Sequence, residues 1–322
     1  MKFKTLFLAG LFLLTSHLMA EKQPNIVFLF VDDLGWADIN YRQDKFDIPN
    51  IKSLMAEGMT FTDAYSSSPT CSPSRASVYT GVHPAQLKIV RHIPHGKPKG
   101  EFHLWGNDPA QFPSRNWLPL EETTFAEVLK KKGYKNAFVG KWHLGDEAYW
   151  PNHQGYDEQY CVSNSGSPRS YYAPYFDKYS KPLENVPKGQ YLTDRLTDKA
   201  LAFLEKQDGK KPFQLTVSYY SVHSPHIGRK DYVKKMKAKK IKGRELHHAA
   251  MLCAVDESLG RIYKTLKEKG LLENTVIFFL GDQGGEFNNR PLRGGKYSES
   301  LNEGGARIPF VVSWAKKIGQ VS

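Results

Sequence analysis

Two continuous apolar runs, each followed at once by acidic residues, restrict the fold of this chain most. Asn25–Val31 and Val276–Leu280 have the length of β-strands and lack polar alternation, so both are predicted to be parallel strands buried on both faces. Asp32-Asp33 follows the first run and Asp282-Gln283 follows the second after one glycine. Ligands of such sheets bind beyond the carboxyl ends of the strands. The two clusters are therefore expected to converge on one cation that prefers oxygen ligands.

Predicted helices alternate with strands along the rest of the chain. Apolar spacing and capping residues predict helices over Ile51–Gly58 (capped by Pro49-Asn50), Thr124–Lys132, Leu192–Lys206 and Glu245–Lys269, and strands over Lys135–Val139 and Phe213–Tyr220. This alternation indicates an α/β fold with a mostly parallel central sheet and helices on both faces.

The N-terminus has the pattern of a secretory signal peptide. Lys2 and Lys4 precede an apolar core at Leu6–Leu14, and Leu18-Met19-Ala20 is a small-residue cleavage site. The apolar core is too short to span a bilayer, so no membrane span is expected. We therefore expect a signal peptide over residues 1–20, cleavage near Ala20, and an exported protein that is periplasmic or secreted.

The mature chain carries excess positive charge. The full sequence has 45 Lys+Arg, 33 Asp+Glu and a formal charge of +12, and residues 1–20 contribute two lysines and no acid. Such a balance favours anionic partners, either nucleic acid or sulfated or phosphorylated polymers. The densest basic run, Lys234–Arg244, is predicted to be a solvated face, with a polymer-binding patch as the alternative.

The three cysteines are too few for a disulfide framework. Cys253 lies at a core position of a predicted helix, and Cys161 has no motif around it; we expect two buried thiols, with a disulfide between them as the alternative. Cys71 lies in Ser68–Arg75, where a predicted helix begins that ends at Thr80. A cysteine at a helix N-terminus beside an arginine suits a nucleophile or an anion site, although a small buried hydrophobe fits as well.

The segment Cys71-Ser72-Pro73-Ser74-Arg75 resembles the C-x-P-x-R signature of type I sulfatases, the formylglycine-dependent members of the alkaline phosphatase superfamily. Further blocks of that family occur along the chain in the family's order: Asp32–Trp36 before this signature, and after it Gly140–Gly145, His223–His226, Asp282–Gly285, Leu292–Lys296 and Glu303–Pro309. The resemblance covers residues 24–314. It implies the sulfatase fold, with a strand at Arg307–Val312, and one catalytic domain over residues 21–322. A smaller C-terminal subdomain of the family is expected to be absent from this chain.

The resemblance implies one divalent cation, usually calcium. Its expected ligands are Asp32, Asp33, Asp282, Gln283 and the residue at position 71. Gln283 departs from the usual Asn or His, but it keeps an amide oxygen, so we expect retained binding with shifted geometry. Carboxylate and amide oxygens are the ligands that calcium prefers.

Formylglycine is implied at position 71, made from Cys71 by a dedicated maturation enzyme. Its hydrate would attack sulfur with one hydroxyl and expel sulfate with the other. The resemblance also gives roles to the other residues. Asp282 accepts the nucleophile's proton, and His223 protonates the leaving alcohol. Lys141 and Lys296 hold sulfate oxygens, and Arg75 and His143 contact the hydrate. His226 either lines the pocket or packs structurally.

The predicted function is an exported sulfate-ester hydrolase that acts on sulfated carbohydrates or aryl sulfates, with no nucleic-acid partner. Two alternatives stay open: a phosphate or phosphonate ester hydrolase of the same superfamily, and an inactive polyanion-binding homologue in which Cys71 never matures. Segments 91–100 and 164–172 are expected to border the pocket and to set substrate identity.

Overall fold

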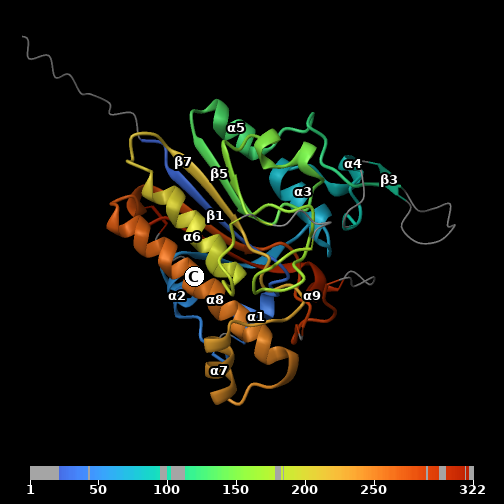
Figure 1. Ribbon diagram of the computed structural model, residues 1–322, viewed down its shortest axis with the longest axis vertical. Helices are drawn as coiled ribbons and strands as arrows, with labels where there is room; N and C mark the ends of the chain where they lie inside the picture. The colour runs from blue at the N-terminus through green and yellow to red at the C-terminus, as the bar shows by residue number, and fades with distance from the viewer. Residues whose placement is uncertain are drawn as a thin grey trace, which may run out of the picture.

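A computed structural model describes residues 22–42, 44–94, 100–102, 113–177, 183, 185–287, 289–296, 302–315 and 317–318. Within this part of the chain, a seven-stranded sheet has the order β2-β9-β8-β1-β7-β5-β6 (Figure 1). The strands are β1 (Asn25–Val31), β2 (Met59–Tyr65), β5 (Lys135–Gly140), β6 (Glu158–Tyr160), β7 (Phe213–Ser218), β8 (Thr275–Gly281) and β9 (Arg307–Ser313). Only β9 runs against its neighbours β8 and β2, which confirms the predicted mostly parallel sheet.

Helices cover both faces of the sheet, as Figure 1 shows. One core packs α2 (Pro49–Glu57), α6 (Leu192–Glu205), α7 (Lys230–Ala238) and α8 (Gly243–Glu268) against one face. The second core packs α3 (Cys71–Thr80), α4 (Pro84–Leu87) and α5 (Phe125–Lys131) against the other. The remaining short elements are α1 (Trp36–Asn40), α9 (Glu303–Ala306), the hairpin of β3 (Glu101–Phe102) and β4 (Ser114–Arg115), and the 3₁₀ turns η1 (Glu147–Tyr149), η2 (Pro151–His153) and η4 (Leu272–Asn274).

The central strand β1 explains why the sheet needs both helical layers. Val27, Leu29 and Val31 belong to the core under α6 and α8, whereas Phe30 belongs to the core under α3 and α5. Burying alternate side chains on opposite faces removes apolar surface from water on both sides. The continuous apolar run in the sequence is therefore a strand with two buried faces, as predicted.

The start of α2 differs from the prediction. Pro49 and Asn50 are the first helical residues and Ile48 is the N-cap, whose side chain makes no capping bond. Asp256 of α8 supplies the missing acceptor, because its Oδ1 accepts from the Ile51 amide at 2.7 Å and its Oδ2 from Asn50 Nδ2 at 2.7 Å. A carboxylate from another helix thus satisfies an amide that the helix itself leaves unpaired.

The basic run Lys234–Arg244 and the cysteines match the sequence predictions only in part. Most of Lys234–Arg244 is exposed on α7 and the turn after it, with Met236 and Ile241 as its buried anchors. All three cysteines are free thiols, so Cys161 and Cys253 form no disulfide. Cys253 is buried as predicted, but Cys161 is partly exposed, because it follows the end strand β6 instead of lying in a helix core.

The predicted signal peptide, residues 1–20, lies outside the described residues. Among the helices that the structure describes, none combines the length and the apolar character needed to cross a bilayer.

Candidate active site

Three carboxylates meet at the carboxyl edge of the sheet. Asp32 and Asp33 follow β1, Asp282 follows β8, and all three are fully buried. The Asp33 amide donates to Asp282 Oδ1 at 3.0 Å, which joins the two strand ends. Asp33 has a φ of +58°, a left-handed conformation that costs energy in a residue other than glycine and is typical of functional sites. The convergence expected from the sequence is therefore present.

Three cations neutralise these carboxylates. Lys141 Nζ lies 2.6 Å from Asp32 Oδ2, and Lys296 Nζ lies 2.7 Å from Asp33 Oδ2. Arg75 contacts Asp282 Oδ2 through Nε at 3.0 Å and through its terminal nitrogen at 2.8 Å. Buried charges are tolerated where they are paired and hydrogen-bonded. If a bound metal ion pairs with the carboxylates instead, the two lysines can bind an anionic group of a substrate.

Cys71 is the first residue of α3, and its side chain faces this cluster. It is 2% exposed. Its Sγ and single carboxylate oxygens of Asp32 and Asp282 lie within 4.8 Å of one another. Burial opposes ionisation, but the charges of Lys141 and Lys296 and a hydrogen bond with His223 outweigh it, so the pKa of the Cys71 thiol lies well below its ordinary value.

The donor set around Cys71 fits an oxygen-seeking cation. Gln283 is buried beside Asp33, to which its Nε2 donates, and the same Nε2 lies 3.5 Å from Cys71 Sγ. Gln283 Oε1 is buried and has no hydrogen-bond donor in the described part of the chain. Three carboxylates and an amide oxygen in need of a partner suit calcium.

His223 is positioned to carry a proton. Its Nδ1 donates to the Ser224 carbonyl at 2.6 Å, so Nε2 is the nitrogen that faces the site, 3.8 Å from Asp33 Oδ2. Burial lowers the pKa of His223, but Asp33 and Asp32 outweigh it and raise the pKa to about 9. Burial and the Asp32 charge also raise the pKa of Asp282, to about 6. At neutral pH one group holds a proton and the other can accept one.

His143 follows Lys141 on the loop after β5 and is held from two directions. Its Nε2 donates to the Ile93 carbonyl at 2.8 Å. A Cβ added to Gly166 would lie 2.2 Å from the imidazole, so the ring fits only against a glycine. Ile93 and Gly166 belong to the two segments that were expected to border the pocket; residues 95–99 of the first lie outside the described residues.

His226 packs structurally. Its ring lies 4.5 Å from that of Phe287, and its Nε2 lies 3.6 Å from Glu286 Oε2. Burial, followed by the charges of His248 and Arg244, lowers the pKa of His226 to about 4, so it is neutral at pH 7. Of the two histidines in the His223–His226 motif, only the first reaches the cluster.

Two supporting residues escaped sequence reasoning. Ser218 accepts from Arg75 at 2.7 Å and donates to the Lys141 carbonyl at 2.7 Å, so it holds the Arg75 side chain and the Lys141 backbone. Asn289 donates to the carbonyls of Gly285 at 2.8 Å and Gly294 at 3.1 Å and so closes the loop that carries Lys296. The only sequence signal for Ser218 was its place near the end of the predicted strand Phe213–Tyr220.

Comparison with known proteins decides the family. The sequence profile of the family named Sulfatase matches residues 24–322. This chain belongs to the sulfatase family. It is 31% identical to N-acetylgalactosamine-6-sulfatase of Rattus norvegicus over 332 residues, which cover 94% of this chain and 59% of the rat protein. It thus spans less than two thirds of that relative's length.

Two solved structures share the fold. Ps i-CgsB, crystallised in complex with k-i-k-neocarrahexaose, has a TM-score of 0.80 and 29% identity, covering 92% of this chain and 67% of that one. The PsFucS1 sulfatase from Pseudoalteromonas sp. has a TM-score of 0.70 and 28% identity over 92% of this chain and 63% of that one. These likenesses agree with the α/β architecture described above.

Proposed function

We propose that this sulfatase-family chain carries the catalytic site of a sulfate-ester hydrolase acting on sulfated glycans. The observation that supports it most is the burial of Cys71, within its C-x-P-x-R sequence, among Asp32, Asp282 and Lys141. The names of the relatives agree with a sulfated carbohydrate as substrate, since one is an N-acetylgalactosamine-6-sulfatase and another structure holds k-i-k-neocarrahexaose.

We further propose that Cys71 is matured to formylglycine and that a divalent cation, calcium, is held by Asp32, Asp33, Asp282, Gln283 and residue 71. When hydrated, the formylglycine supplies a hydroxyl nucleophile and a second hydroxyl that permits sulfate release, and the cation supplies positive charge for a sulfate oxygen. Maturation requires a separate enzyme. The signal-peptide pattern of residues 1–20 supports export.

The protein's own side chains then have distinct tasks. Lys141 and Lys296 turn from their carboxylates to the sulfate oxygens and stabilise the charge that develops as the S–O bond breaks. Asp282, beside Cys71, accepts the proton of the nucleophile. His223, whose Nε2 faces the site, gives a proton to the leaving oxygen. Arg75 stays with Asp282 and holds the start of α3 in place.

The test is turnover of matched aryl esters. Purified protein, matured and supplied with calcium, should hydrolyse nitrophenyl sulfate and lose that activity on Cys71→Ala. Nitrophenyl phosphate is the control substrate, because it has the same leaving group. Faster hydrolysis of the phosphate than of the sulfate would contradict the proposal and favour a phosphoesterase.

A further inference from the structure

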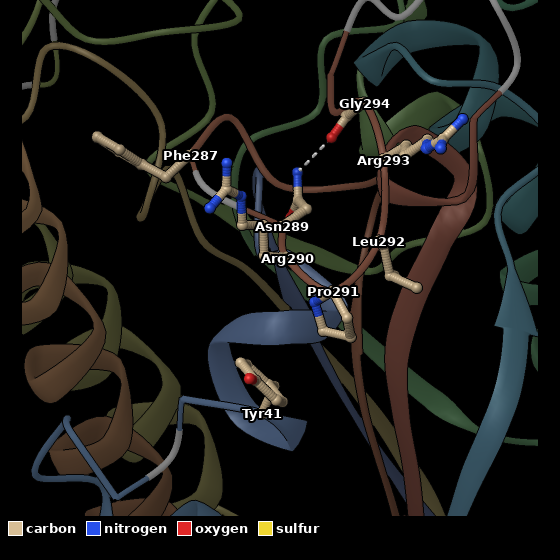
Figure 2. Close-up of a pocket in the computed structure, with 8 residues that line it drawn as sticks. All are labelled: Tyr41, Phe287, Asn289, Arg290, Pro291, Leu292, Arg293 and Gly294. Atoms are coloured by element: carbon tan, nitrogen blue, oxygen red, sulfur yellow. Dashed lines mark hydrogen bonds between the residues drawn. The ribbon is translucent and has the colours of Figure 1, made fainter.

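A pocket of about 690 Å³ opens on the loop that joins β8 to Lys296. Tyr41, just after α1, lies at one side of it, and the loop supplies the other side, including Phe287, Arg290 and Arg293. Figure 2 shows Phe287 and the guanidinium group of Arg290 on the same side of the loop, Tyr41 below them, and Arg293 on the other side. None of these four residues has a task in the proposed hydrolysis.

We propose that this pocket is a subsite for a neighbouring sugar of the glycan that carries a second sulfate group. The inference rests on the proposed function, because it describes where the rest of the substrate lies once one sulfate ester is held at Cys71.

The pocket is tied closely to the catalytic cluster. The Lys296 amide donates to the Gly285 carbonyl at 3.1 Å, and Asn289 holds the carbonyls of Gly285 and Gly294 together. Gly294, in the pocket lining, is two residues from Lys296, so their Cα atoms are at most about 7.6 Å apart. The pocket lining and the lysine proposed to hold the sulfate thus belong to one short loop.

The lining has the chemistry of an anionic sugar site. Tyr41 is 63% exposed and offers an aromatic face beside the pocket. Arg290 is exposed too, and its planar guanidinium matches the geometry of an oxyanion through paired hydrogen bonds. None of the described residues that line the pocket is acidic. The carboxylate of Glu286, which precedes Phe287, is paired with Arg244 at 3.0 Å.

One wall of the pocket is rigid. The Phe287 ring lies 4.5 Å from the ring of His226 and 4.6 Å from that of His248, and the guanidinium of Arg244 lies 5.3 Å from it. Arg244 is exposed, lies in the first turn of α8 and is the last residue of the basic run Lys234–Arg244. Arg244 pairs there with Glu286 at 3.0 Å, which holds it against the ring. A preformed wall lowers the ordering cost of binding a sulfated chain.

The experiment compares two oligosaccharides that share one cleavable sulfate and differ by a second sulfate on the adjacent sugar. They are chosen from chondroitin, heparan and carrageenan fragments by wild-type turnover. The measured quantity is kcat/KM on each oligosaccharide divided by kcat/KM on nitrophenyl sulfate. Arg290→Gln should lower this ratio about tenfold for the doubly sulfated ligand and much less for the other. Tyr41→Ala should lower it for both, and Tyr41→Phe should restore it.

Arg261→Gln is the matched control, because Arg261 lies on α8 and pairs with Asp198 at 2.7 Å. Unchanged ratios in Arg290→Gln and Tyr41→Ala, or an equal fall in Arg261→Gln, would overturn the subsite. Calorimetric titration with the same oligosaccharides tests the pocket without turnover: wild type should prefer the doubly sulfated ligand and Arg290→Gln should not. A wild type that hydrolyses no sulfate ester would contradict the proposed function instead.

Discussion

Asp33 connects four parts of the site. Its amide binds Asp282, its carboxylate pairs with Lys296 and accepts from Gln283, and its charge raises the pKa of His223. Asp33 also has a left-handed backbone, a conformation that persists in such a residue only where the surrounding structure holds it. The contacts with Asp282, Lys296 and Gln283 together hold Asp33 in this conformation.

The nucleophile gives the first prediction. Cys71→Ser should abolish multiple turnover of nitrophenyl sulfate, because a serine hydroxyl can attack sulfur but offers no second hydroxyl to expel sulfate. The intact mass of the variant after incubation with substrate should reveal a retained sulfate group. Sustained multiple turnover by Cys71→Ser would contradict the formylglycine mechanism.

A second prediction separates His223 from the sulfate-binding lysines. A sugar alkoxide needs a proton as it leaves, whereas nitrophenolate needs little, so His223→Ala should lower kcat on a sulfated sugar about 10²–10⁴-fold more than on nitrophenyl sulfate. Lys296→Ala should harm both substrates alike, since both develop the same charge on the sulfuryl group. Equal losses for His223→Ala would make this residue a sulfate ligand and leave the proton donor unidentified.

At the residue scale, the positions of side chains at the end of a strand or the start of a helix could be predicted from the sequence. The positions of Asp32, Asp282 and Cys71 follow from that rule and from the family motifs. Ser218 and Asn289 could not be found this way, because each acts on backbone or side-chain atoms whose approach depends on the folded loop. His226 lies within a motif but turns to Phe287, which spacing alone does not reveal.

At the scale of elements, α2 depends on α8 for its first turn. Asp256 is 3% exposed and accepts two hydrogen bonds from that turn. Removing the acceptor in Asp256→Ala leaves the Ile51 amide buried and unsatisfied, so the free energy of unfolding should fall by about 1–3 kcal/mol. Asp198→Ala is the control, because its ion pair with Arg261 is largely exposed and should matter by less than about 1 kcal/mol. Equal effects in denaturant titrations would show that α2 forms without this cap.

The same carboxyl predicts a pH dependence. Burial raises the pKa of Asp256 to about 6, above the value of about 3.9 in an unfolded chain. The native state therefore binds the proton more tightly, and this contribution to stability is present below about pH 4 and lost as the pH rises through 6. Asp256→Asn cannot titrate, so its stability relative to wild type should increase between pH 4 and pH 7, on the order of 2 kcal/mol. A pH-independent difference in unfolding free energy would contradict the shift.

The elements themselves were predicted unevenly. β1 has the bounds that its apolar run indicated, because burial on both faces leaves a clear sequence pattern. β2 was missed: it is an end strand whose residues are mostly exposed, and Thr and Asp interrupt its apolar residues. Its place is decided by pairing with β9, a contact between segments about 250 residues apart that local pattern does not encode.

On the scale of the whole molecule, the proposed cation site lies at the edge of the sheet, outside both cores. Chelation should therefore remove activity while the circular dichroism of the folded sheet and helices persists. Calcium should raise the thermal midpoint, because it binds the native arrangement of carboxylates and not the unfolded chain. Asp32→Ala should abolish that stabilisation. Full turnover of nitrophenyl sulfate by calcium-free protein would show that the cation assignment is wrong.

The central claim is that residue 71 becomes the catalytic aldehyde, and the mass of one peptide tests it most directly. Trypsin cleaves after Lys52 and Arg75, so residues 53–75 form a single fragment that contains Cys71. Protein that hydrolyses sulfate esters should yield this fragment with the thiol replaced by an aldehyde, detected by its lower mass and by capture with a hydrazide. An active preparation in which every copy of the fragment carries an intact thiol would contradict the account.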